Sequence, residues 1–173
     1  LRRYKDHLEQ EVRQRTAELL QSNARLSDTQ FAMDKAGIGI HWVDFTNGRF
    51  LYVNDYGAQL FGYTPAELQQ LRVIDIDPNF TLENFKARFQ QMREAVAATI
   101  ETIVCHKDGH IIPISVTYYY QAEAADRKAR FICFVSDITV RKQAEAQLVE
   151  AKNAAEAASR SKTLFLSNVS HEL

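Results

Sequence analysis

Two long stretches without glycine or proline, residues 1–30 and 139–173, flank a middle segment that contains every glycine and proline of the chain. Glycine and proline are the residues that most often interrupt helices, so each flank can form one continuous helix. In the first flank Val12, Leu19 and Leu26 recur every seven residues, which is the period of a coiled-coil seam. We therefore predict an N-terminal coiled-coil helix over residues 1–30.

The second flank carries a longer seam, because residues that are small or apolar, apart from Lys162 and Glu172, recur there in alternating steps of four and three. This period of 3.5 residues predicts a left-handed coiled coil over residues 139–173. In the first flank Asn23 follows Leu19 by four residues, and a buried asparagine there would favour a parallel pair of helices. We therefore expect a parallel homodimer, the alternative being a solvated helix packed on its own domain. The second seam consists of Ala144, Leu148, Ala151, Ala155, Ala158, Lys162, Phe165, Val169 and Glu172.

The middle segment, residues 31–138, predicts an α+β fold. Five short apolar or alternating runs read as strands, and Asn47-Gly48 and Asp108-Gly109 are hairpin-turn dipeptides between two pairs of them. Helices should lie between the second and third strands. Thr64-Pro65-Ala66-Glu67 has the pattern of a capping box with proline at the first helical position. A longer helix is predicted from about Thr81 to Val96, with one apolar face made by Leu82, Phe85, Phe89 and Met92.

Composition and charge limit which binding partners and which cellular location we expect. The net charge is −1, and no basic recognition helix or patch is present, so nucleic acid is not an expected partner. Cys105 and Cys133 lie in apolar runs and are expected to stay reduced. No run approaches the ~20 apolar residues of a transmembrane helix, and there is no signal peptide. We predict a cytoplasmic location without membrane contact by this chain, although the parent protein could be anchored in a membrane.

The middle segment resembles a PAS domain. The resemblance implies a five-stranded antiparallel sheet with helices on one face and a sensory role, with haem, flavin, a small metabolite or nothing in its core. The residues that carry it, in family order, are Val53-Asn54-Asp55, Leu60-Phe61-Gly62-Tyr63-Thr64, Glu67-Leu68, Asp75-Ile76-Asp77-Pro78, Lys107-Asp108-Gly109, Asp137-Ile138-Thr139 and Arg141-Lys142.

The last four residues, Ser170 to Leu173, resemble the phosphoacceptor box that begins the dimerisation and phosphotransfer domain of sensor histidine kinases. The resemblance implies that His171 is phosphorylated and that Glu172 orients its ring or takes its proton. On a helical wheel His171 points away from the apolar seam, as a group that meets ATP must. Both ends of the chain look cut, so we expect a piece of a kinase, inactive alone because the ATP-binding domain is missing. In the intact kinase a response regulator or receiver domain would be the partner.

The PAS resemblance also implies a ligand pocket. Haem is disfavoured because the long helix offers only Met92, and flavin because neither cysteine fits the reactive motif and apolar residues replace the amides that grip the ring. A small, mostly apolar ligand with His41 and Tyr118 as polar contacts is one expectation, and a fully packed core is the other. The expected lining consists of His41, Val43, Phe85, Phe89, Val104, Ile114, Val116, Tyr118, Cys133 and Val135.

Two further candidate sites lie at the ends of strands. His106 and His110 flank the Asp108-Gly109 turn, but we expect no carboxylate or cysteine to complete a metal site and predict none. At the end of the last strand, Asp137 and Thr139 precede the second helical flank without a flexible residue, and Thr139 is predicted to cap that helix. A shift of the sheet should therefore move the helix. Three functions remain open: ligand sensing, ligand-free relay, and haem- or flavin-based redox or light sensing.

Overall fold

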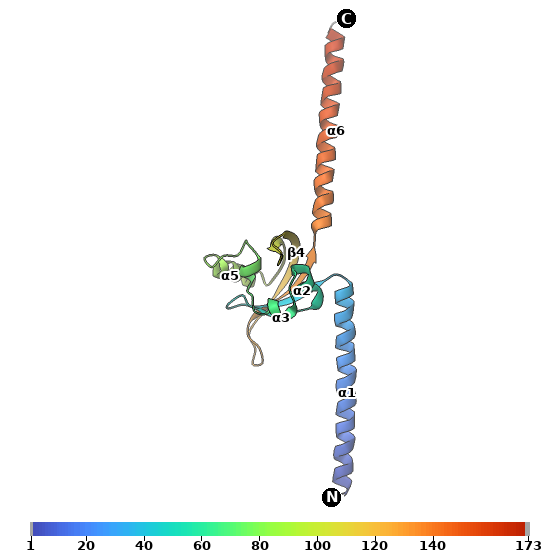
Figure 1. Cartoon of the computed structure of the whole chain (residues 1–173), viewed down its shortest axis with the longest axis vertical. Coiled ribbons are helices and arrows are strands. Elements are labelled where there is room, and N and C mark those ends of the chain that lie inside the picture. Colours follow the sequence, from blue (N-terminus) through green and yellow to red (C-terminus); the bar gives the residue numbers. More distant parts are fainter. Residues whose placement is uncertain (1, 172–173) are drawn as a thin grey trace.

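In a computed structural model, the chain is described over residues 2–171, and side chains over residues 5–163. Two long helices leave a compact α+β body in opposite directions (Figure 1). In chain order, the elements are α1 (Arg2–Lys35), β1 (Gly39–Asp44), β2 (Phe50–Val53), α2 (Asp55–Phe61), α3 (Pro65–Leu68), α4 (Val73–Ile76), α5 (Phe85–Ala95), β3 (Ala97–Cys105), β4 (Ile111–Gln121), β5 (Arg130–Asp137) and α6 (Thr139–His171).

Within the described residues, one antiparallel sheet holds five strands in the order β2-β1-β5-β4-β3. Both predicted hairpins form. Gly48 and Gly109 adopt φ values of +70° and +97°, which residues with a Cβ rarely reach. In the register, Cys133 of β5 lies opposite both His41 of β1 and Tyr118 of β4. The predicted fold class, a PAS-type sheet with helices on one face between two long helices, is confirmed.

The core lies between the sheet and the short helices. Every second residue of β4 from Ile112 to Tyr118 is buried, and β5 alternates in the same way from Phe131 to Val135. The helices contribute Phe61, Leu68, Ile76 and Phe89 to the opposite wall of this core. The predicted capping box is also present, because Thr64 and Glu67 exchange side-chain hydrogen bonds with each other's backbone N–H at the start of α3.

The helix predicted from about Thr81 to Val96 is wrong at its start and agrees to within one residue at its end. The N–H of Thr81 donates to Oδ1 of Asn84, and the N–H of Asn84 donates to Oγ1 of Thr81, which forms a separate turn before α5 begins at Phe85. Leu82 therefore points to solvent and is 76% exposed, instead of packing in the core. At the other end Val96 has a φ of +63°, outside the helical region, so α5 stops at Ala95.

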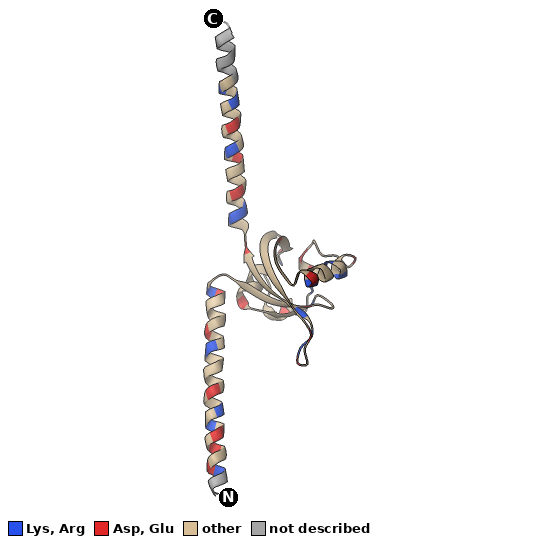
Figure 2. Ribbon diagram, turned by 180° about the vertical axis from the view of Figure 1, so that it is seen from behind, with Lys and Arg blue, Asp and Glu red and all other residues tan. Residues whose placement is uncertain are grey.

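The two long helices expose their apolar positions in the single chain. Val12, Leu19 and Leu26 on α1 are each about 60–65% exposed, and Leu148 on α6 is 72% exposed. Charged residues are distributed along both helices (Figure 2). α1 runs past the predicted boundary at residue 30. None of the helices described in residues 2–171 has both the length and the apolar character needed to cross a bilayer.

Candidate functional site

A small cavity of about 60 Å³ lies between the sheet and helices α4 and α5. Its wall is almost entirely apolar, and the polar side chains that reach it are His41, Asp77 and Thr102. The full lining is His41, Val43, Phe50, Phe61, Val73, Ile76, Asp77, Phe80, Phe89, Met92, Ile100, Thr102, Val104, Ile114, Val116, Phe131 and Cys133.

Seven of the ten residues expected around the pocket are in this lining, and Phe85, Tyr118 and Val135 are not. Phe85 packs beside Gly48, where a Cβ would stand only 2.6 Å from its ring, and its ring centroid is 4.3 Å from that of Phe89. Tyr118 packs edge-on against Phe131 at 5.6 Å. Val135 pairs with Gly39 of β1, where helix α2 approaches the sheet. A Cβ added at Gly39 would lie 3.0 Å from the Cα of Gly57 on α2 and 3.5 Å from the Cβ of Val135.

His41 is the buried polar group of the cavity that lacks a partner. Its side chain is 7% exposed, and Nδ1 has no hydrogen-bond partner among the described residues. The ring packs against the aromatic rings of Phe50 and Phe61, at 5.2 and 6.2 Å between centroids. Burial lowers the pKa of His41 to about 4. The imidazole is therefore neutral at neutral pH and offers an unused hydrogen-bonding nitrogen.

Asp77 is a second polar group at the cavity, and sequence reasoning did not place it there. Its carboxylate accepts the N–H of Asn79 at 2.8 Å and the hydroxyl of Thr102 at 3.0 Å. Burial raises the pKa of Asp77, while these hydrogen bonds oppose the rise. The sequence signal for it was the Asp77-Pro78-Asn79 turn, in which an aspartate commonly accepts the N–H two residues on. The contact with Thr102 joins residues 25 positions apart, so no local sequence pattern indicates it.

The cavity does not fit haem or flavin. Pockets for drug-sized ligands are typically ~300–1,000 Å³, several times the volume between these walls. Val104 and Ile114 present only aliphatic groups where flavin-binding relatives are expected to offer amides, and Val135 lies outside the lining. The helix face at the cavity carries Phe89 and Met92, with no histidine on α5 to ligate iron. A molecule of a few heavy atoms is the size that these walls admit.

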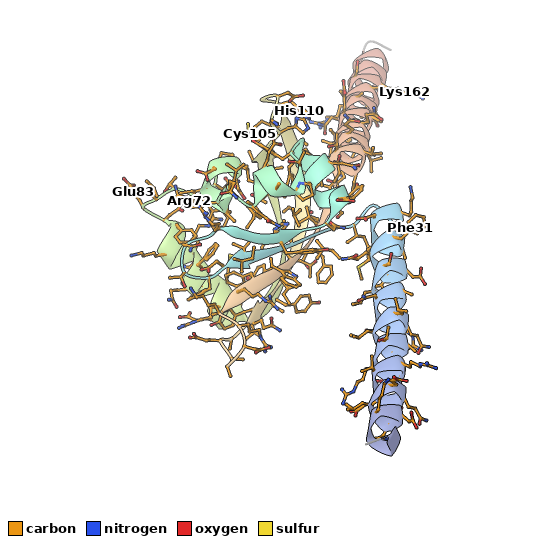
Figure 3. All side chains as sticks on the ribbon, turned by 60° about the horizontal axis from the view of Figure 1, so that its bottom comes forward. Phe31, Arg72, Glu83, Cys105, His110 and Lys162 are labelled. Atoms are coloured by element: carbon orange, nitrogen blue, oxygen red, sulfur yellow. The ribbon has the colours of Figure 1, made fainter. Side chains whose placement is uncertain are left out.

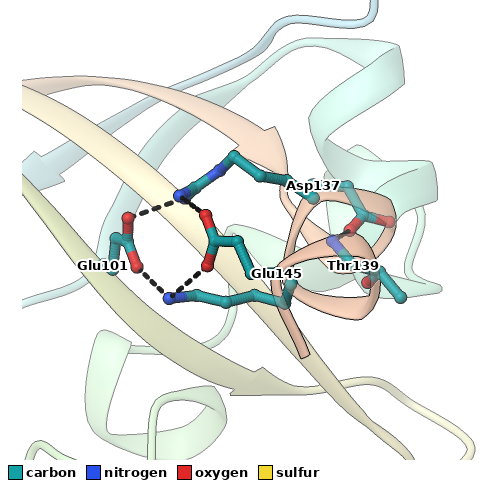
Figure 4. Close-up of polar contacts among 6 residues, drawn as sticks. Glu101, Asp137, Thr139 and Glu145 are labelled. Atoms are coloured by element: carbon teal, nitrogen blue, oxygen red, sulfur yellow. Dashed lines mark hydrogen bonds and ion pairs between the residues drawn. The ribbon is translucent and has the colours of Figure 1, made fainter. Parts of the chain in front are cut away.

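The junction between β5 and α6 contains a single residue, Ile138. Its side chain is buried at 7% exposure, and its N–H donates to the carbonyl of Pro113 on β4 at 3.1 Å. Oδ1 of Asp137 accepts the N–H of Thr139 at 2.7 Å (Figure 4). The expectation that Thr139 caps the helix is therefore wrong: Thr139 is the first helical residue, and Asp137 supplies the capping oxygen.

A group of ion pairs holds the first turns of α6 against β3, and sequence reasoning missed it. Glu101 accepts a hydrogen bond from Nη2 of Arg141 at 2.6 Å, and its other oxygen lies 2.6 Å from Nζ of Lys142 (Figure 4). Glu145, one turn further along α6, lies against the same two cations. The pairs with Lys142 and Arg141 lower the pKa of Glu101. Helix α6 is thus attached to β3, β4 and β5 at its base.

Helix α1 is attached to the body at its C-terminal end. Oδ1 of Asp34 accepts a hydrogen bond from Nδ2 of Asn54 at 2.7 Å and lies 3.3 Å from the N–H of Tyr56. Asn54 itself caps α2 by accepting the N–H of Gly57 at 3.0 Å, and its Oδ1 also accepts the N–H of Ile40 on β1 at 2.7 Å. Movement of α1 would therefore reach both α2 and the sheet through one asparagine.

The turn between β3 and β4 brings two histidines and a carboxylate together. Oδ1 of Asp108 lies 2.9 Å from Nδ1 of His106 and 2.5 Å from Nδ1 of His110. The expectation that no carboxylate would accompany these histidines was wrong. The sequence showed the residues but not that one oxygen of Asp108 comes within hydrogen-bond distance of both rings.

The predicted phosphoacceptor, His171, is the last residue of α6. Helix α6 continues without interruption to His171, whose side chain lies outside the described residues, as does Glu172 altogether.

Comparison with known proteins places this fold in a family. A family model described as a PAS domain matches residues 37–140, which is more than half of the chain. The hybrid signal transduction protein dokA of Dictyostelium discoideum is 31% identical over 140 residues. That match covers 79% of this chain but only 8% of the relative, so the chain spans a small part of the length of the curated protein it matches.

Solved structures agree with the fold. The PAS domain of an HTR-like protein from Haloarcula marismortui superposes with a TM-score of 0.62 at 18% identity, covering 73% of this chain and 99% of that one. A sensory box histidine kinase/response regulator from Burkholderia thailandensis E264 gives a TM-score of 0.54 at 19% identity, covering 74% and 97%. At these identities the likeness concerns the fold alone.

Proposed function

The chain belongs to the PAS domain family, and we propose that it is the sensory and signal-transmission module, on the cytoplasmic side, of a two-component sensor histidine kinase. In this proposal a signal received by the PAS body passes through α6 to His171. His171 takes a phosphoryl group from ATP in the intact kinase and passes it to a receiver domain. Relatives named as a hybrid signal transduction protein and as a histidine kinase/response regulator support this context.

The observation that carries the proposal is the attachment of α6. One buried residue, Ile138, separates β5 from α6, and its N–H donates to the carbonyl of Pro113 on β4. Glu101 of β3 and Asp137 of β5 bind the first turn of the helix itself. From Thr139 to His171 the helix is unbroken, a length of ~48 Å at 1.5 Å per residue. A change in the sheet is therefore transmitted as a movement of the whole helix, limited by the difference in ligand affinity between the two states.

The apolar side chains exposed on α1 and α6 support a parallel homodimer. In a dimer, Leu19 and Leu26 would pack against their counterparts, and the alanine-rich seam of α6 would allow close approach of two helices. Sedimentation equilibrium tests this. We expect a dimer for the chain, and Leu19→Lys should weaken it, whereas Gln21→Lys, also exposed on α1, should not. A monomer at all concentrations would contradict the proposed pairing.

The phosphoacceptor role has a direct test in the parent kinase. His171→Gln should abolish transfer of labelled phosphate from ATP to the protein, while His7→Gln, which changes an exposed histidine on α1, should leave it intact. Phosphorylation that persists in His171→Gln would overturn this assignment.

The small volume of the cavity favours a second candidate, a ligand-free relay. About 60 Å³ leaves room for very few atoms, and Asp34 provides a path by which α1 could deliver a signal from upstream. Thermal denaturation against a panel of small metabolites separates the two. A stabilised complex that depends on His41 supports sensing, and a panel without effect, together with loss of regulation in Asp34→Ala, supports relay.

A further inference from the structure

The β3–β4 turn, His106-Lys107-Asp108-Gly109-His110, is built so that three potential metal ligands converge. The N–H of His106 donates to the carbonyl of His110 at 2.8 Å, and the N–H of Gly109 donates to the carbonyl of His106 at 2.8 Å. The φ of +97° at Gly109 allows this tight reversal. The two imidazoles are stacked, with centroids 4.4 Å apart and ring planes 27° from parallel.

The third ligand, Asp108, lies beside the Nδ1 edges of the two stacked rings. One carboxylate oxygen is within hydrogen-bond distance of Nδ1 on both histidines. One ligand atom from each of the three residues lies within 4.8 Å of the others. Ions bound at ~2.0–2.2 Å hold their ligands at most about 4.3 Å apart. Small side-chain rotations would therefore bring all three onto one ion.

His106 is fixed in place by the body of the domain. Its ring lies over Gly62, where a Cβ would stand 2.3 Å from Cε1 and Nε2. That side of the ring is occupied by backbone, so Nδ1 is the nitrogen that faces Asp108. The turn is held to α2 and α3 by the N–H of Lys107, which donates to the carbonyl of Phe61 at 3.0 Å, and by the ion pair of Lys107 with Glu67 at 2.7 Å.

The remaining two ligands are open to solvent. The side chains of Asp108 and His110 are 64% and 56% exposed, and His106 is 20% exposed. An ion could thus enter from water without unfolding the hairpin, and water could complete its coordination. None of His106, Asp108 and His110 is among the residues that line the cavity, and Figure 3 shows His110 at the edge of the body. The cluster is therefore separate from the PAS pocket.

We propose that His106, Asp108 and His110 form a binding site for a divalent transition-metal ion. Two imidazoles and one carboxylate suit Zn²⁺, Ni²⁺ or Cu²⁺, whereas Mg²⁺ and Ca²⁺ prefer oxygen ligands. Such a site is independent of phosphorylation at His171 and of any ligand in the cavity.

A titration with Zn²⁺ in competition with a chromogenic chelator tests the proposal on the whole chain. The wild type should bind one ion per chain at this site. Asp108→Asn and His110→Ala should each lower the affinity at least tenfold, because each removes one of three ligands. His7→Ala and His171→Ala remove other histidines and should bind as the wild type does. A hundredfold excess of Mg²⁺ should not displace the ion.

The location is checked by NMR, in which the imidazole signals of His106 and His110 should shift together on addition of Zn²⁺. Far-ultraviolet circular dichroism ensures that each variant is folded. The proposal is overturned if the wild type binds no Zn²⁺, because hydrogen bonds alone then explain the cluster. It is equally overturned if Asp108→Asn and His110→Ala bind as the wild type does, or if His171→Ala abolishes binding.

Discussion

Oε1 of Glu101 lies 2.6 Å from Nη2 of Arg141, and this contact joins strand β3 to the first turn of α6. Glu101→Gln removes the charge that also holds Lys142. We expect faster amide hydrogen exchange in the first two turns of α6, with little change in the sheet. The difference from wild type should shrink at 1 M salt, because salt already screens these exposed pairs in the wild type.

Glu83→Gln is the matched control for that experiment, because Glu83 is an exposed acid in the turn before α5 (Figure 3). It should leave exchange in α6 unchanged. Equal exchange in Glu101→Gln and wild type at low salt would mean that the ion pairs do not hold the helix.

The hydrogen bond at the start of α6 predicts different effects for substitutions at Asp137 and at Thr139. Asp137→Ala removes the oxygen that accepts the N–H of Thr139 and should cost about 1 kcal/mol of stability. Thr139→Ala should cost much less, because only the backbone of Thr139 takes part in this bond. Urea denaturation measures both. If Thr139→Ala lowered the free energy of unfolding more than Asp137→Ala does, the threonine side chain would be the cap.

In the parent kinase the same two variants test whether the junction transmits the signal from the PAS body to α6. Asp137→Ala should alter the response of autophosphorylation to the stimulus, while Thr139→Ala should retain it. A normal response from Asp137→Ala would separate the cap from signalling.

Burial of His41 makes stability depend on pH with a defined sign. The folded-state pKa of about 4 is below the ordinary value of 6.5, so between these values the unfolded chain binds a proton that the folded chain does not. Stability contributed by the neutral ring is complete above pH 6.5 and falls as the pH drops toward 4, by about 3 kcal/mol in all.

His41→Phe isolates that term. Phenylalanine keeps a flat ring among Phe50 and Phe61, and the adjoining cavity can take its extra volume. Its free energy of unfolding, measured from pH 7 to pH 4, should fall less steeply than that of wild type, while His7→Ala should follow the wild type. Parallel curves for His41→Phe and wild type would show that His41 is not the titrating group.

Gly62 and Gly109 form a matched pair with different surroundings. Both have positive φ, so replacement by alanine should cost about 1–2 kcal/mol at either position for the backbone alone. At Gly109 nothing lies within 4 Å of an added Cβ, whereas at Gly62 the His106 ring stands in its place. Gly62→Ala should therefore be the more destabilising in thermal unfolding and should displace His106. Equal losses would show that the ring moves aside freely.

Local patterns were enough to predict the sheet, both hairpins and the start of α3, because alternation, turn dipeptides and capping residues act within a few positions. The start of α5 was wrong since Leu82 fits the helical period, and nothing in that period reveals the exchange of hydrogen bonds between Thr81 and Asn84.

The candidate site was likewise predicted in part. The alignment with the PAS family predicted that His41, Val116 and Cys133 would face inward, and all three line the cavity. Tyr118 and Val135 are buried as well, but Tyr118 packs against Phe131 and Val135 lies beside Gly39, where α2 approaches. These contacts do not follow from an alignment. Glu101 was missed because its partner Arg141 is 40 residues away, beyond any periodic signal.

The opposed exits of α1 and α6 bear on how such a protein can be assembled from parts (Figure 1). The chain enters and leaves the body along roughly the same line, with the sheet to one side of it. A second PAS unit with its own flanking helices could be joined end to end with this one, and the helices of the two units would continue along the same line. Gain or loss of a whole unit would then leave the direction of α6 unchanged. An insertion into α6 that is not a multiple of the helical repeat would instead rotate the residues that follow it about the helix axis.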